Sequence, residues 1–210
     1  MRCQGAVSLG KGLDQRAAAC EAVNAMDYHP SVSSDPETRI RLALDGAIEA
    51  LKLARREAEG AREDRQRLRW VAVGMVSALQ CALVAALSGY DTATLEAVLD
   101  PPQDDRVAPV SLLLRRARSQ EYLSPPEKLE LTTGRLHAIE RVVSLRNAGV
   151  HGLDAEPPES FFRDAETLLD VISHLAVHAP AFDVKTFRVQ HIFLTDQCAG
   201  LYQDLNALRG

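Results

Sequence analysis

Apolar residues recur every three or four positions along most of this chain, which is the period of a helix with one buried face. The clearest start lies at Asp35, which suits a helix N-cap, and Pro36 suits the first helical position. These signals predict a helix over 35–60. Its apolar stripe consists of Ile40, Leu44, Ala47, Ile48, Leu51 and Ala54.

A second helix is predicted over 62–87, and its later part, residues 70–87, is apolar on almost every side. A membrane span needs about 20 apolar residues, whereas the central helix of a bundle is buried on most sides. The run is rich in alanine and holds Gln80 near its middle, which favours a core helix with Trp70 as a core anchor. A single-span membrane protein is the less favoured alternative.

The second half of the chain shows further stripes of helical period. The sequence Ser124-Pro125-Pro126-Glu127 is typical of a helix start, and Gly152 and Pro180 are typical of helix ends. Long helices are predicted at 126–150 and 159–178, and one last helix at 186–209 in the tail. Shorter helical segments are predicted at 92–99 and 109–119, with a loop at 101–105.

Composition supports an all-helical fold. Apolar residues make up 46% of the chain and are mostly Ala, Leu and Val, whereas aromatic residues make up only 5%. We therefore expect an all-α fold, a bundle of four long helices with short accessory helices. The predicted organisation is a flexible leader over 1–34, a bundle over 35–180 and a C-terminal helical tail over 181–210.

Charge and cysteine content narrow the class of function. The formal net charge of −5 argues against nucleic-acid binding through bulk charge, so any such binding needs a local basic patch. The four cysteines are widely and irregularly spaced, which predicts neither a zinc site nor a disulfide scaffold. With no apolar stretch typical of a secretory signal at the start, we expect a reducing, cytoplasmic compartment. The cysteines are Cys3, Cys20, Cys81 and Cys198.

Common cofactor and metal motifs are absent from the sequence. It contains no glycine-rich phosphate loop, no Gly-x-Ser-x-Gly and no His-Glu-x-x-His. His174 and His178 have the spacing of a metal pair on a helix, but no carboxylate motif lies nearby, so a surface or core-edge position is favoured. We expect no metal and no cofactor.

One short segment combines chemically able side chains, at the end of the predicted helix 126–150. Arg146, Asn147 and His151 follow one another so that Asn147 and His151 share a helix face and Arg146 lies about 100° to one side. A histidine can act as an acid or base near neutral pH, and an arginine can hold a phosphate. With no Ser or Cys nucleophile in sequence reach, the trio suits phosphodiester cleavage better than acyl transfer.

These three residues, in this place, resemble the HEPN superfamily, whose members are helical bundles carrying an Arg, a polar residue that is often Asn, and a His shortly after them. The resemblance covers roughly residues 36–178. The resemblance implies a homodimer in which two motifs meet. It also implies a metal-independent ribonuclease of toxin–antitoxin, phage-defence or RNA-processing systems. An antitoxin-like protein would be a further partner. His151 would then handle protons, Arg146 would stabilise the transition state and Asn147 would position the pair.

Other interpretations of the motif remain open. Basic residues in a last helical turn stabilise the helix dipole, and Gly152 suits the left-handed turn that ends a helix. A catalytically inactive RNA-binding or protein-interaction domain of the same fold is therefore the alternative function.

Two arginine clusters are candidates for an RNA path. The cluster with no acid within it is the better candidate, and the other is typical of a solvated helix face. The first comprises Arg115, Arg116 and Arg118, and the second Arg62, Arg65, Arg67 and Arg69.

Overall fold

In the computed structural model, helix α2 (Pro36–Gly60) begins where the local signals predict. The Asp35 side chain accepts a hydrogen bond from the Thr38 backbone N–H at 2.8 Å, and Pro36 occupies the first turn. The structure describes residues 32–90, 93–101, 103–152 and 156–209. The predicted leader over 1–34 therefore lies almost wholly outside the described residues, as do Cys3 and Cys20.

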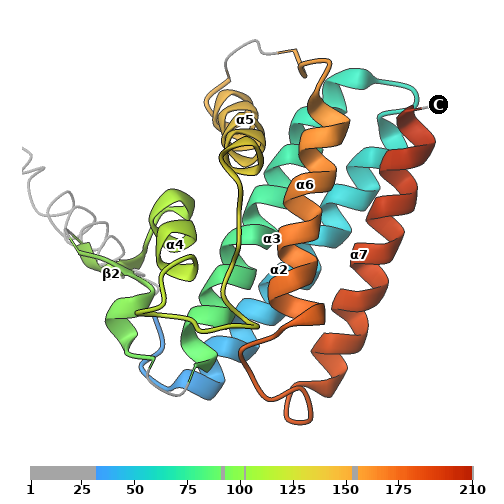
Figure 1. The fold of residues 1–210 in the computed structure, drawn as a ribbon. Coiled ribbons are helices and arrows are strands. Elements are labelled where there is room, and N and C mark those ends of the chain that lie inside the picture. The colour runs from blue at the N-terminus through green and yellow to red at the C-terminus, as the bar shows by residue number, and fades with distance from the viewer. Residues whose placement is uncertain (1–31, 91–92, 102, 153–155, 210) are drawn as a thin grey trace, which may run out of the picture. The chain divides into compact units, whose positions relative to one another are not determined.

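Helix α3 (Leu68–Gly89) starts six residues later than predicted, after a separate 3-10 turn at Arg65–Arg67. The reason is local, because the Asp64 carboxylate caps that turn by accepting from the Gln66 backbone N–H at 2.9 Å. Helix α3 then runs through the middle of the molecule, in contact with α2 and with three helices that follow it in the chain (Figure 1). It is the central helix of the core.

The segment 65–89 is long and apolar enough to cross a membrane by length and composition alone, and 78% of its most apolar window is buried inside the bundle. A membrane-spanning helix was expected to leave one whole side exposed. Helix α3 instead buries most of its length against neighbouring helices, as the core-helix interpretation predicts.

A small β-hairpin follows α3 where a loop over 101–105 was predicted. Strands β1 (Leu99–Asp100) and β2 (Gln103–Val107) pair antiparallel, after a 3-10 turn at Leu95–Ala97. The buried Arg116 on helix α4 (Val110–Ala117) fastens this region, because its Nη1 donates to the backbone carbonyls of Ala97 at 3.1 Å and of Leu99 at 2.8 Å. A long-range contact of this kind has no local sequence signal.

Helix α5 (Thr133–Val150) starts seven residues after the predicted start at Pro126, so that prediction is wrong. Ser124 and Pro125 each precede a proline, a position that disfavours helical backbone, and the true cap is Thr132, whose Oγ1 accepts from the Arg135 N–H. The segment before α5 contains a turn in which the backbone N–H of Lys128 donates to the Ser124 carbonyl at 3.0 Å, and the N–H of Leu129 donates to the Ala117 carbonyl at 3.0 Å.

Two helices complete the bundle (Figure 1). Helix α6 (Phe161–Ser173) continues as a π-helical turn at His174–His178, and α7 (Arg188–Arg209) packs against α2 and α6. Helix α7 contributes buried leucines to the common core, so the predicted tail over 181–210 belongs to the same compact unit as residues 32–180. The chain is thus mostly helical, and the all-α class is confirmed. The core leucines of α7 are Leu194, Leu201 and Leu205.

Candidate functional site

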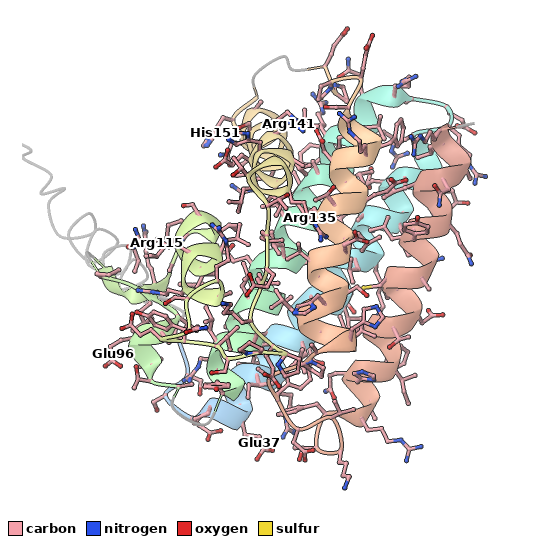
Figure 2. All side chains as sticks on the ribbon, in the orientation of Figure 1. Glu37, Glu96, Arg115, Arg135, Arg141 and His151 are labelled. Carbon is pink, nitrogen blue, oxygen red and sulfur yellow. The ribbon has the colours of Figure 1, made fainter. Side chains whose placement is uncertain are left out.

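The motif spans the C-terminal end of α5, from Arg146 to the C-cap residue His151, and the helix ends there for local reasons. The backbone N–H of His151 donates to the Asn147 carbonyl at 3.0 Å and caps the helix, and Gly152 then takes the left-handed conformation with φ of 69°. Figure 2 shows His151 at this end of α5, at the outside of the bundle. The predicted helix end at Gly152 is confirmed, and the His151 side chain is exposed to solvent.

Within the motif, Arg146 and Asn147 are in direct contact. The Arg146 Nη1 donates to the Asn147 Oδ1 at 3.0 Å. Asn147 and His151 are exposed, whereas Arg146 is half-buried. Within the described residues, the imidazole of His151 makes no hydrogen bond, so both ring nitrogens are free to exchange protons with a bound molecule.

An ion pair between the partly exposed Arg141 and the buried Asp164 joins α5 to α6, five residues before Arg146. Asp164, only 1% exposed, accepts from the Arg141 Nε and Nη2 at 2.7 Å each and from the Ser160 hydroxyl at 2.7 Å. Burial raises the pKa of Asp164, but the hydrogen bonds from Arg141 and Ser160 and the charge of Arg141 outweigh it, so this pKa lies below 3.8. The bidentate pair fixes the direction of the motif helix.

Helix α3 supplies two further side chains beside the motif. The aliphatic stem of Arg69 packs on Gly149 of α5, with its Cβ 3.4 Å from where a Cβ at Gly149 would lie. The Arg69 guanidinium then lies over the Trp70 ring, 5.7 Å from its centroid. Trp70 is 39% exposed, so its predicted role as a core anchor is wrong. It lies on the side of α3 that its neighbours leave partly open, in line with Val73 and Ser77.

Positive charge at this place is not neutralised. Within the described residues, neither Arg69 nor Arg146 has a carboxylate within 4.0 Å, and the Nε of each is buried without a hydrogen-bond partner. Arg67, two residues away, is instead paired with Glu57 at 2.9 Å. We call Arg69, Trp70, Arg146, Asn147 and His151 the motif surface; its charge and its exposed ring suit an anionic, partly aromatic ligand.

Sequence reasoning placed Arg69 in the arginine cluster typical of a solvated helix face, although the sequence holds a signal that sets Arg69 apart. The positions three and four residues to either side of Arg69 carry no acid, so no intrahelical partner is available. Arg67, by contrast, has Asp64 and Glu63 at those spacings. Treating the cluster as one solvated face concealed this difference.

The arginines of the cluster predicted for RNA binding do not share one exposed surface. The cluster comprises Arg115, Arg116 and Arg118. Arg116 points inward, where it holds the β-hairpin and lies 5.9 Å from the Tyr122 ring centroid, so its assignment to an RNA surface is wrong. Arg115 and Arg118 are exposed. Figure 2 shows Arg115 on α4, a different helix from the one that carries His151.

His174 and His178 lie in the π-helical turn and line a surface hollow of about 540 Å³ between α6 and the segment before α5. The Nε2 of His174 lies 3.4 Å from the Glu127 carbonyl oxygen. In the part of the chain that the structure describes, no three His, Cys, Asp or Glu side chains are grouped so as to hold a metal ion.

Comparison of this chain with protein-family models, with curated proteins and with solved structures gives no match. Function is therefore inferred from the geometry of the motif surface.

Proposed function

We propose that this protein is a metal-independent, HEPN-type endoribonuclease that acts as a homodimer with a composite site of Arg146, Asn147 and His151. One observation carries the proposal. Among the described residues, Arg146 donates to Asn147 at 3.0 Å and has no carboxylate within 4.0 Å, and five residues later the exposed His151 has an imidazole without a hydrogen-bond partner. A cation beside a free acid–base group is what phosphodiester transfer requires.

In the proposed reaction, an RNA 2′-hydroxyl attacks the adjacent phosphorus. The new bond from the 2′-oxygen to phosphorus forms as the bond to the 5′-oxygen of the next nucleotide breaks. His151 accepts the proton of the 2′-hydroxyl and returns a proton to the leaving 5′-oxygen. Arg146 binds the phosphoryl oxygens on which charge accumulates, and Asn147 holds the guanidinium in place. The products are a 2′,3′-cyclic phosphate and a 5′-hydroxyl.

The alternative is a catalytically inactive RNA-binding or protein-interaction domain of the same fold. It is favoured by the local geometry, because the backbone of His151 and the left-handed Gly152 together complete the end of α5 whatever the side chains do. An antitoxin-like protein partner remains a prediction under either function.

The deciding experiment is RNA cleavage in EDTA by the wild-type protein and by His151→Ala and Arg146→Ala. We expect cyclic-phosphate ends from the wild type and at least about a hundredfold slower cleavage by each variant. Arg188→Ala removes an exposed arginine on α7 and serves as the matched control, with unchanged cleavage. Circular dichroism and thermal melting establish that each variant is folded.

Mixing the two inactive variants tests the composite site. If the Arg146 of one chain works with the His151 of the other, a heterodimer of His151→Ala and Arg146→Ala contains one intact site. Random exchange then restores about a quarter of wild-type activity. No restoration places both residues in one chain, and no wild-type cleavage of structured or unstructured RNA moves the assignment to the inactive domain.

A further inference from the structure

Trp70 is placed unusually for a large aromatic residue at the start of an apolar helix. Its ring is 39% exposed, and one face carries the Arg69 guanidinium. Val150, on the last turn of the motif helix, is 47% exposed. An exposed aromatic ring with an arginine over it contributes little to the stability of the fold. The same pair offers a flat apolar surface and a cation to a ligand.

The contacts of Arg69 link this ring to the motif. Gly149 lies three residues after Arg146 on α5. Because it has no side chain, the aliphatic stem of Arg69 lies directly against α5 at this position. The guanidinium groups of Arg69 and Arg146 therefore extend from one helix contact, and each carries a buried Nε–H without a partner in the described residues. A buried donor without a partner is costly to a folded protein, and a bound ligand that accepts from it removes that cost.

The chemistry of the surface selects among ligands. A protein partner would need carboxylates for two guanidinium groups and a pocket for an indole. A single-stranded nucleic acid supplies both features in each of its repeating units, a phosphate for the arginine and a flat base for the ring. A duplex does not offer the base face, because its bases are already stacked.

We propose that Arg69 and Trp70 form a nucleotide-binding subsite beside the motif, in which Trp70 stacks on an unpaired RNA base and Arg69 holds the neighbouring phosphate. The proposal rests on the proposed function for the identity of the ligand and extends it to the substrate class, which is unpaired RNA. Stacking accepts every base, so the subsite selects single strands over duplexes and not one sequence over another.

The test uses the fact that Trp70 is the only tryptophan of the chain, so intrinsic fluorescence reports on this position alone. The full-length His151→Ala protein, which keeps Arg69 and Trp70, is titrated with dye-labelled oligouridine and, separately, with its duplex with oligoadenosine. We expect tryptophan quenching by the single strand, with the same midpoint as the anisotropy change of the dye, and much weaker quenching by the duplex.

Variants in the same His151→Ala background separate stacking from packing. Trp70→Ala should weaken single-strand binding about tenfold, whereas Trp70→Phe should keep most of the affinity because a ring remains. Arg69→Ala should lower the salt dependence of binding by about one phosphate contact. Tyr202→Ala, which removes an exposed ring on α7, is the matched control and should leave affinity unchanged.

The outcomes distinguish the subsite from the nuclease. If the wild-type protein cleaves RNA while Trp70→Ala binds normally and no quenching occurs, the subsite is refuted and the nuclease stands. If the single strand quenches Trp70 and Trp70→Ala lowers the affinity, while the wild-type protein does not cleave RNA, the subsite is supported and the nuclease is refuted. A tryptophan emission that shifts to shorter wavelength with protein concentration alone would overturn the subsite, because it would place Trp70 between two protein copies.

Discussion

The three arginines of helix α5 share one residue type but contact different partners. Arg135 pairs with Asp170, whose side chain is 62% exposed, whereas Arg141 binds the buried Asp164 through two nitrogens. Among the described residues, Arg146 has no ion-pair partner, and its side chain donates its one hydrogen bond to Asn147. Along one helix, Arg135 thus has an exposed ion-pair partner, Arg141 has a buried one, and Arg146 has none among the described residues. We expect each arginine to respond differently to mutation.

Arg141→Ala should lower the free energy of unfolding by about 3 kcal/mol, because it leaves the Asp164 carboxylate buried with only the Ser160 hydroxyl as a side-chain partner. Arg135→Ala, on the same helix, should cost about 0.5 kcal/mol, since its pair is solvated and screened. Urea denaturation of both variants measures the difference. Equal losses would show that the bidentate pair does not hold α5 on α6.

The sequence alone singles out Arg146, Asn147 and His151 as candidates, because their types and spacing are local properties, and their role stays a prediction. It was not sufficient to place Trp70 or Arg116. Helical periodicity says which residues share a face, but which face is covered depends on helices far away in the chain. The guanidinium of Arg116 points inward because the Ala97 and Leu99 carbonyls accept its hydrogen bonds there. No local sequence pattern predicts the position of these carbonyls.

At the scale of elements, helices α2 and α3 approach each other most closely at Gly74. A Cβ at this position would lie 2.7 Å from the Ala50 carbonyl oxygen and 2.8 Å from the Ala54 nitrogen, both backbone atoms that cannot move without shifting α2. In the sequence Gly74 is only an interruption of an apolar run. In the structure it is the residue that allows the two helices to pack.

Gly74→Ala should therefore lower the free energy of unfolding by about 1–3 kcal/mol, although alanine is the better helix former. Gly134→Ala is the control, because a Cβ there meets only the Thr132 Oγ1 at 4.0 Å. Its stability should stay unchanged or rise by up to about 1 kcal/mol. A Gly74→Ala protein as stable as the wild type would contradict the close packing of α2 on α3.

Helix starts were predictable where one short segment decides them. Asp35 and Pro36 act on their own first turn, and the start of α2 was correct. The predicted start of α5 was wrong because Ser124 and the two following prolines satisfy the same local rules. The segment that they begin is not helical, and it places Leu129 in the core.

For the whole molecule, carboxylates that the fold stabilises in the charged form predict how stability depends on pH. A hydrogen bond from Arg67 lowers the pKa of Glu57 below 4.5, against the opposing effect of burial, and the pKa of Asp164 also lies below its ordinary value. A pKa that is lower in the folded state stabilises the protein above the unfolded-state pKa, and this stability is lost as the pH falls through the folded-state pKa.

We therefore expect the free energy of unfolding to fall steadily as the pH is lowered below about 4.5, with proton uptake on unfolding. Asp164→Asn and Glu57→Gln should each show a shallower decline over this range than the wild type, since each removes one such carboxyl group. Urea denaturation across this pH range provides the measurement. A wild-type curve that is flat below pH 4.5 would be incompatible with these assignments.

The central position of α3 has a consequence for how the chain is made. Among the described α-helices that contact α3, α2 alone precedes it, while α4, α5 and α6 follow. At about 5–20 residues synthesised per second, α3 emerges from the ribosome seconds before α6 can cover it. During that interval the nascent chain displays a helix as apolar as a membrane span. A chain that stops before α6 retains this exposed surface and should be held by chaperones or aggregate.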